Sequence, residues 1–404
     1  MLGDVERPSR VRAQQEVALR VYVRRQVYPY SAFNRARLSA AGLGPFDVRA
    51  PADLVRLPPV TWSEVGDGVD LVLRPHRTTI ARLGSPTLAF RVLLARAFGR
   101  GQTLNRSVID PIYRPISWIV QEGVAVGMTV NDLERLSEIG RRWLEAAGVR
   151  GTDVVAGVLP SGSELDYWQL TAATRRAGVP TALLPSAPSL DDVVRLRPTV
   201  IAGRPADVVA LAQAAVWSNS PALSAVHTVL VTGELLDDDV RSTLKRLLGK
   251  DALVLGAWAP AGVRALWAEC RGGTGYHTWP AAELVDVVDP ATFEPVGPDV
   301  EGEVVWSALG WGGSVVLRLR TGVRAVLDDA RCSACGRTTP RIVPVSGGAP
   351  SDFAPILDAH PGVAAWQGEL SRRNGAEELV VFVAPSRPGH PGRLIHDLDE
   401  RLRA

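Results

Sequence analysis

The stretch Asp153-Val-Val-Ala-Gly-Val-Leu159 decides the fold, because two similar stretches follow it, Thr199-Val-Ile-Ala202 and Thr228-Val-Leu-Val-Thr232. Each is short, apolar and rich in β-branched residues, which is the pattern of a buried strand. Helical patterns lie between them, at about 164–177 and from Pro205 to Val216. Strands that alternate with helices at this spacing predict a parallel sheet with helices on both faces.

The same alternation extends in both directions from this stretch. Upstream, a helix is expected from Thr129 to Ala147, with Thr129 as its N-cap and Asp132 and Glu134 near the positive end of its dipole. The other elements expected in this series are a strand from Pro180, a short helix from Asp191 to Arg195, a helix from Asp237 to Leu248 and a strand from Ala252 to Leu255. The fold class predicted is therefore α/β.

The rest of the chain differs from this series. Residues 10–41 have a helical pattern, and after residue 283 alternating apolar residues and turn signals predict strands. The strands expected there are Glu283–Val288, Gly302–Ser307, Val315–Arg320 and Ala325–Leu327. From Gly347 a small α+β tail is expected, with a helix near Phe353–Ala359, a strand Glu378–Val383 and a helix Leu394–Leu402. The predicted division is a core, 1–345, with a β-rich region at about 264–345, and a short C-terminal domain, 346–404.

Composition and charge exclude several classes of function. The formal net charge is +2, which argues against a nucleic-acid or anionic-membrane partner. No apolar run reaches the length of a membrane helix, and the N-terminus lacks the layout of a signal peptide. Three cysteines cannot all pair with one another, so a reducing, cytoplasmic location is expected.

All three cysteines lie in a region that predicts a metal site. Cys332 and Cys335 form a Cys-x-x-Cys pair, while Cys270 and His277 form a second pair with six residues between them. Three thiolates and one imidazole complete a tetrahedral zinc sphere and leave no open position, which is typical of structural zinc. Three reduced thiols and a surface histidine are the alternative.

Several fragments, in order, resemble the phenylacetate–CoA ligase branch of the adenylate-forming (AMP-binding) enzymes. They are Pro29–Phe33, Arg37–Leu43, Thr199–Pro205, Thr232-Gly233-Glu234, Arg318-Leu-Arg320-Thr-Gly322 and the knuckle at Cys332, and the resemblance covers roughly residues 20 to 345. It implies an adenylate-forming-type core, with Gly233 and Glu234 beside the adenine and Arg320 in the nucleotide site. It also implies that the tail corresponds to a shortened form of the family's mobile C-terminal lid, and some relatives bind zinc through such a knuckle.

Four features that the family uses for adenylation are missing at the matching places. The phosphate loop reads Ile116-Ser-Trp-Ile-Val-Gln-Glu-Gly123, where bulky side chains shield the amides and Glu122 repels phosphate. The segment Gly256–Gly262 has no glutamate to assist Mg²⁺, and Val323 follows Arg320-Thr-Gly322 where the family has its ribose aspartate. No lysine occurs after Lys250, so the catalytic lysine of the lid is absent.

These departures favour a catalytically degenerate protein that acts by binding a small acyl or aromatic carboxylate or a protein partner. The alternative is an active, divergent acid–CoA or acid–AMP ligase that uses ATP, Mg²⁺ and CoA. In that alternative Arg318, Arg320 and Arg337 are the candidates for phosphate contact, and Glu234 is the remaining acidic group.

Overall fold

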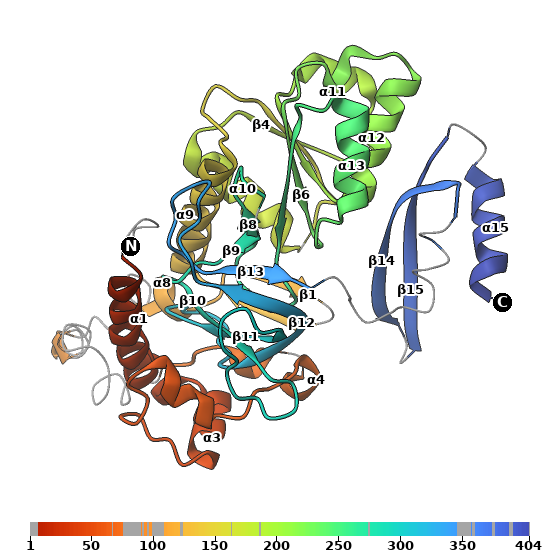
Figure 1. The fold of residues 1–404 in the computed structure, drawn as a ribbon. Coiled ribbons are helices and arrows are strands. Elements are labelled where there is room, and N and C mark those ends of the chain that lie inside the picture. The colour runs from red at the N-terminus through yellow and green to blue at the C-terminus, as the bar shows by residue number, and fades with distance from the viewer. Residues whose placement is uncertain are drawn as a thin grey trace. The chain divides into compact units, whose positions relative to one another are not determined.

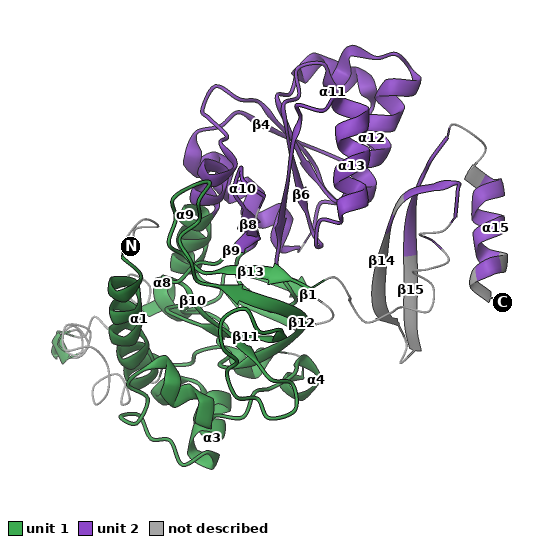
Figure 2. Cartoon of the chain, viewed as in Figure 1, with its two compact units in different colours: residues 1–139, 260–265, 277–345 green, residues 140–259, 266–276, 346–404 purple. Residues whose placement is uncertain are grey.

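A computed structural model describes residues 7–66, 68–75, 90, 93–94, 97–98, 109–121, 124–162, 164–185, 187–273, 275–345, 357, 360–373, 376–387 and 391–403 (Figure 1). The chain divides into two compact units. The first consists of residues 1–139, 260–265 and 277–345, and the second of residues 140–259, 266–276 and 346–404 (Figure 2). The chain is mixed α/β, as predicted, and the division into domains 1–345 and 346–404 stays a prediction.

The second unit contains the parallel sheet that the alternating pattern predicted. Its strands lie in the order β8-β7-β6-β5-β3-β4; β3, β4, β5, β6 and β7 are parallel, and β8 pairs antiparallel with β7. The strand bounds are β3 (Val155–Val158), β4 (Thr181–Leu184), β5 (Val200–Gly203), β6 (Thr228–Thr232), β7 (Leu253–Trp258) and β8 (Trp267–Glu269). The helix bounds are α10 (Leu165–Ala177), α11 (Leu190–Leu196), α12 (Pro205–Trp217) and α13 (Asp238–Leu248), with a 3-10 turn at Pro221–Leu223.

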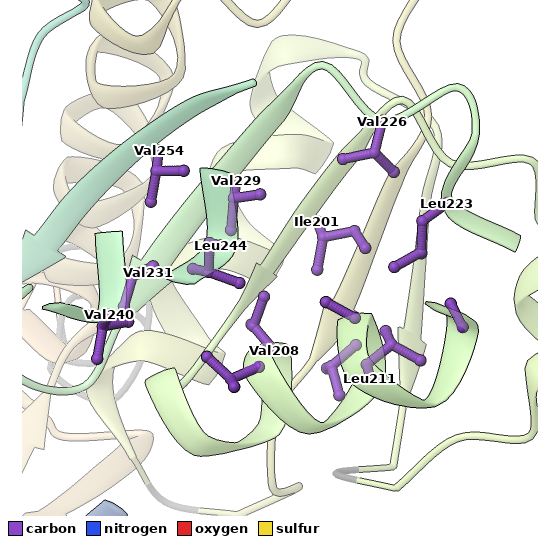
Figure 3. Close-up of a cluster of buried hydrophobic side chains, with 14 of the residues drawn as sticks. Ile201, Val208, Leu211, Leu223, Val226, Val229, Val231, Val240, Leu244 and Val254 are labelled. Atoms are coloured by element: carbon purple, nitrogen blue, oxygen red, sulfur yellow. The ribbon is translucent and has the colours of Figure 1, made fainter. Parts of the chain in front are cut away.

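The apolar core of the second unit lies between this sheet and helices α12 and α13 (Figure 3). Ile201 of β5 and Val229 and Val231 of β6 are fully buried there, against Val208 of α12 and Leu244 of α13. Complete burial of one such side chain contributes about 1.5–3 kcal/mol. Because their side chains are buried, these strands are continuous apolar runs in the sequence.

The first unit holds a second set of strands, paired antiparallel in the order β10-β11-β12-β13. Their bounds are β10 (Glu283–Val288), β11 (Gly302–Ala308), β12 (Leu319–Asp328) and β13 (Arg341–Pro344), and a separate hairpin joins β1 (Ser117–Gln121) to β2 (Val124–Met128). The N-terminal helices are α1 (Pro8–Tyr22), a π-helical turn (Val23–Val27), α2 (Tyr28–Tyr30), α3 (Ala32–Ala40), α4 (Trp62–Val65) and α8 (Asp110–Tyr113), with 3-10 turns at Pro51–Arg56 and Val69–Leu71.

Helix α9 (Val130–Ala147) begins as predicted. The Thr129 hydroxyl accepts a hydrogen bond from the Asp132 amide at 3.2 Å, and the Asp132 carboxylate accepts one from the Thr129 amide at 3.0 Å. This reciprocal cap satisfies two amides at the helix start. Asp132 also accepts hydrogen bonds from the amides of Gly312 and Gly313, both at 2.8 Å, so the cap also holds the turn that precedes residues 315–318.

The prediction of a strand at Val315–Arg320 is wrong for residues 315–318. These residues are buried but irregular; Arg318 has a positive φ of 52°, and a single strand, β12, runs from Leu319 through the predicted strand at 325–327. Asn34 replaces a strand partner here, because its side chain donates to the Val315 carbonyl at 2.8 Å and accepts from the Leu317 amide at 3.3 Å. Buried apolar residues alone do not distinguish this arrangement from a strand.

The C-terminal tail contains two long antiparallel strands, β14 (Val363–Arg373) and β15 (Ala376–Pro385), and helix α15 (Pro391–Arg403). The sequence predicted β15 and α15 but missed β14. Ala384 of β15 belongs to the apolar core of the second unit. Of the helix expected near Phe353–Ala359, the structure describes only Leu357, which is helical and fully buried.

Candidate functional site

The four predicted metal ligands come together. One ligand atom from each of Cys270, His277, Cys332 and Cys335 lies within 4.8 Å of all the others, and Cys335 Sγ is 3.4 Å from His277 Nε2. Sulfur and nitrogen ligands of one tetrahedral zinc ion lie about 3.5 Å apart. The donor set and its spacing therefore fit zinc, with His277 binding through Nε2.

Backbone and side-chain hydrogen bonds hold this cluster in place. The Cys332 amide donates to the Arg337 carbonyl at 2.8 Å, and the Gly336 amide donates to the Cys332 carbonyl at 2.9 Å. Gly336 has a φ of 73°, a conformation that favours glycine. His277 ends the short strand β9 (Tyr276–His277), and its Nδ1 lies 2.9 Å from the Thr339 hydroxyl, which is the kind of outer partner that orients a zinc-bound imidazole.

Gly233 and Glu234 follow β6, where the carboxyl ends of parallel strands commonly bind ligands. Gly233 has a φ of 91°, and a side chain there would meet Arg204 and Asp166 at 3.1–3.4 Å. Burial raises the pKa of Glu234 to about 7, although nearby Arg204 lowers it. Buried Glu234 Oε1 accepts no hydrogen bond from any described residue.

Glu269, which the sequence did not predict as a site residue, lies beside β7. Glu269 on β8 is 3% exposed and accepts a hydrogen bond from the Gly256 amide at 2.7 Å. Arg241 binds both of its carboxylate oxygens, at 2.9 and 3.1 Å. Glu269 is therefore held in an ion pair with Arg241, and the pairing of β7 with β8 brings it beside Gly256.

The arginines of the Arg318-Leu-Arg320 motif are engaged by the protein itself. Arg320 binds both carboxylate oxygens of Glu303, at 2.8–3.1 Å, and this hydrogen bonding raises the pKa of Arg320. Arg318 is 2% exposed and donates to the carbonyls of Leu54, Val55 and Phe293, the last at 2.7 Å. Both guanidinium groups are therefore held by hydrogen bonds within the first unit.

Asp328 and Asp329, the aspartates that follow Val323 most closely in the sequence, are also held in ion pairs. Asp328 pairs with Arg341, and Asp329 pairs with Arg12 at 2.6 Å. A carboxylate that replaced the ribose aspartate would have to break one of these pairs, so neither compensates for Val323 in this arrangement.

The stretch that matches the phosphate loop forms the hairpin β1–β2. Ile119 packs inward, while Trp118 and Val120 expose about two-fifths of their surface on the other face. The backbone amides of this hairpin lie in the plane of the ladder with bulky side chains above and below it, unlike those of a glycine-rich loop. Glu122, which the sequence predicts to repel phosphate, and the neighbouring Gly123 lie outside the described residues.

Comparison with known proteins agrees with the resemblance. A phenylacetate–coenzyme A ligase of Thermus thermophilus is 25% identical over 399 residues, which cover 94% of this chain and 82% of the relative. The chain is phenylacetate–CoA ligase-like. No protein-family model matches it.

Solved structures show the same fold. 2-Hydroxyisobutyryl-CoA ligase in its postadenylation state superposes with a TM-score of 0.70 at 17% identity, covering 99% of this chain and 85% of that one. An open conformation of the same ligase, in complex with 2-HIB-AMP and CoA, gives a TM-score of 0.69 at 16% identity and covers 91% of that chain. This phenylacetate–CoA ligase-like chain therefore has the architecture of an acid–CoA ligase over nearly its whole length. Among its described helices, none combines the length and apolarity needed to cross a membrane.

Proposed function

We propose that this chain is a catalytically degenerate, phenylacetate–CoA ligase-like protein that binds a small acyl or aromatic carboxylate without adenylating it. The observation that carries the proposal is that the charged groups available for adenylation are bound to the protein itself. Arg241 donates two hydrogen bonds to the Glu269 carboxylate, and Arg320 donates two to the Glu303 carboxylate. Recruiting Glu269 or Arg320 to Mg·ATP would require breaking its pair.

The lysine content supports the same proposal. Lys245 and Lys250 are the only lysines, and both lie at the C-terminal end of α13 or just beyond it. An arginine does not substitute directly for the lid lysine, because its fork is larger and presents its charge differently. The proposed protein therefore lacks the cation that approaches the reacting phosphate.

ATP–pyrophosphate exchange tests the proposal. The full-length protein is assayed with phenylacetate, 2-hydroxyisobutyrate and a panel of other aryl and acyl acids, beside an active phenylacetate–CoA ligase as a positive control. Calorimetry measures Mg·ATP binding in the same preparations. We expect no exchange and little or no ATP affinity. Robust exchange with any acid would refute the proposal and favour the alternative, an active acid–CoA or acid–AMP ligase that uses ATP, Mg²⁺ and CoA.

We also propose that zinc binds Cys270, His277, Cys332 and Cys335 in a structural role. Support comes from the convergence of the four donor atoms and from the hydroxyl that orients the imidazole. When bound, the ion cross-links the segments that carry its ligands, and four protein ligands leave no position for a substrate. A protein partner and a cytoplasmic location remain part of the proposal, the latter supported by three cysteines that form no disulfide.

A further inference from the structure

Four large apolar side chains lie exposed close together in the sequence of the first unit. The exposed fraction is 61% for Phe90, 57% for Leu93, 41% for Leu94 and 71% for Phe98. Phe90, Leu93 and Leu94 are helical, and the Phe98 amide donates a hydrogen bond to the Leu94 carbonyl at 3.0 Å. Single exposed apolar residues are ordinary on a protein surface, whereas several large ones together mark an interaction site.

The spacing of these four residues is that of one helix face. Leu93, Leu94 and Phe98 follow Phe90 by three, four and eight positions, which places all four within an arc of about 140° on a helix. A face of this kind normally packs against the core. Helix α1 of the same unit does so, because it buries Val11, Leu19 and Tyr22. The face formed by Phe90, Leu93, Leu94 and Phe98 is instead exposed to solvent.

The sequence around this face is strongly basic. Residues 71–109, the basic stretch, contain no aspartate, glutamate or lysine, and they contain seven arginines, Arg74, Arg77, Arg82, Arg91, Arg96, Arg100 and Arg106. The formal charge of the basic stretch is therefore +7, whereas that of the whole chain is +2, so the other residues together carry −5. The small net charge of the chain hides this separation.

Exposed phenylalanine and leucine within an arginine-rich stretch fit the surface of an anionic bilayer. Such a surface takes up apolar side chains at its acyl boundary, and its anionic headgroups attract arginine. A nucleic acid would attract the arginines, but its phosphates and base edges offer little to a pair of leucines. A symmetric dimer through this face would bring two stretches of charge +7 together, which like-charge repulsion opposes.

We propose that the basic stretch binds the surface of an anionic bilayer through the face formed by Phe90, Leu93, Leu94 and Phe98. The apolar side chains enter the acyl boundary, and the arginines of the basic stretch supply the electrostatic attraction to the headgroups. The chain then lies on the membrane surface. The inference goes beyond the proposed function, because it concerns where the chain acts, and it holds whether or not the chain adenylates an acid.

Cosedimentation of the full-length protein with lipid vesicles tests this inference. One set of vesicles is pure phosphatidylcholine, and the other contains about 30 mol% phosphatidylglycerol, which is anionic. At about 0.1 M salt we expect the partition coefficient to be at least about tenfold higher for the anionic vesicles. The preference should fall severalfold at about 0.5 M salt, because salt screens the attraction between arginine and headgroup.

Variants of the apolar face separate its contribution from that of charge. Phe90→Ser combined with Phe98→Ser should lower the partition coefficient on anionic vesicles at least about tenfold, because two exposed aromatic rings no longer enter the bilayer. Leu93→Ser combined with Leu94→Ser is a second, independent substitution. The control is Ile395→Ser, because Ile395 is also a large apolar residue, 64% exposed, but lies on α15 of the second unit. It should leave the partition coefficient unchanged.

A charge variant tests the basic stretch directly. Arg91→Gln, Arg96→Gln and Arg100→Gln together should reduce the preference for anionic vesicles to less than about threefold. A matched control removes the same charge from exposed positions of the second unit, through Arg175→Gln, Arg195→Gln and Arg387→Gln. The control should keep the preference.

Several results would overturn the inference. They are equal binding to the two kinds of vesicle, no binding to either, and undiminished binding in both apolar variants once circular dichroism shows that they fold. Binding to duplex DNA in place of vesicles, measured by fluorescence anisotropy, would assign the arginines to a nucleic acid. A dimer seen by light scattering and lost in Phe90→Ser/Phe98→Ser, without vesicle binding, would assign the face to a second copy of the chain.

Discussion

Substitution of Cys332 by serine should release zinc from the protein. Cys332 is 1% exposed, and its sulfur lies within 4.8 Å of the three other donor atoms. A serine hydroxyl does not ionise near neutral pH, so the variant keeps three ligands and loses a thiolate. We expect the zinc content to fall from about one ion per chain to less than about a tenth of an ion.

The loss of stability follows from linkage between metal binding and folding. Zinc buffered at about 100 times its dissociation constant stabilises the native state by about 2.7 kcal/mol. The first unit, which carries His277, Cys332 and Cys335, contains about 200 residues, and for that size 1 kcal/mol shifts Tm by about 2–4 °C. We therefore expect Tm to fall by about 5–11 °C, either in Cys332→Ser or in the wild-type protein after chelation.

Metal analysis and thermal unfolding measure the two effects together. Ser333→Ala is the matched control, because Ser333 is exposed and lies beside Cys332 in the same knuckle. The control should retain zinc and respond to a chelator as the wild type does, whereas the Tm of Cys332→Ser should no longer respond. Stoichiometric zinc in Cys332→Ser, or a wild-type protein that takes up no zinc, would refute the reasoning.

Three further predictions concern Glu269 and Glu234 in the second unit and Gly262 in the first. Glu269→Gln should lower stability by about 3 kcal/mol, the lower end for breaking a buried ion pair, because Arg241 remains 20% exposed; an unchanged urea midpoint would contradict this. Gly262→Ala should lower Tm far more than Gly322→Ala does. Both glycines have a positive φ, but only at Gly262 would the new Cβ lie 1.9 Å from a tryptophan ring. Equal decreases in Tm would show that backbone strain alone acts. Glu234 has a pKa raised from 4.5 to about 7 in the folded state, so its ionisation opposes folding as the pH rises through this range. Glu234→Gln should therefore gain stability relative to the wild type between about pH 5 and pH 8, by at most about 3 kcal/mol, and a constant difference in Tm would contradict the assignment.

Local sequence predicted most of the elements that carry the sheet of the second unit. Buried strands such as Val200–Gly203 and Thr228–Thr232 are short apolar runs, and the helices between them have polar faces, so their periods differ visibly. The local pattern wrongly predicted a strand at residues 315–318, where hydrogen bonds with the Asn34 side chain take the place of those with a partner strand. That contact joins residues 281 positions apart, and no local pattern reports it.

The sequence by itself determined the α/β class, the resemblance to the phenylacetate–CoA ligases and the identity of the four metal-ligand candidates. These depend on residue type and on spacing along the chain. Only the tertiary structure decided which charged groups form ion pairs, such as Glu269 with Arg241 and Arg320 with Glu303. Hydrogen bonding and desolvation depend on distances of a few ångströms between segments far apart in sequence, and folding alone sets those distances.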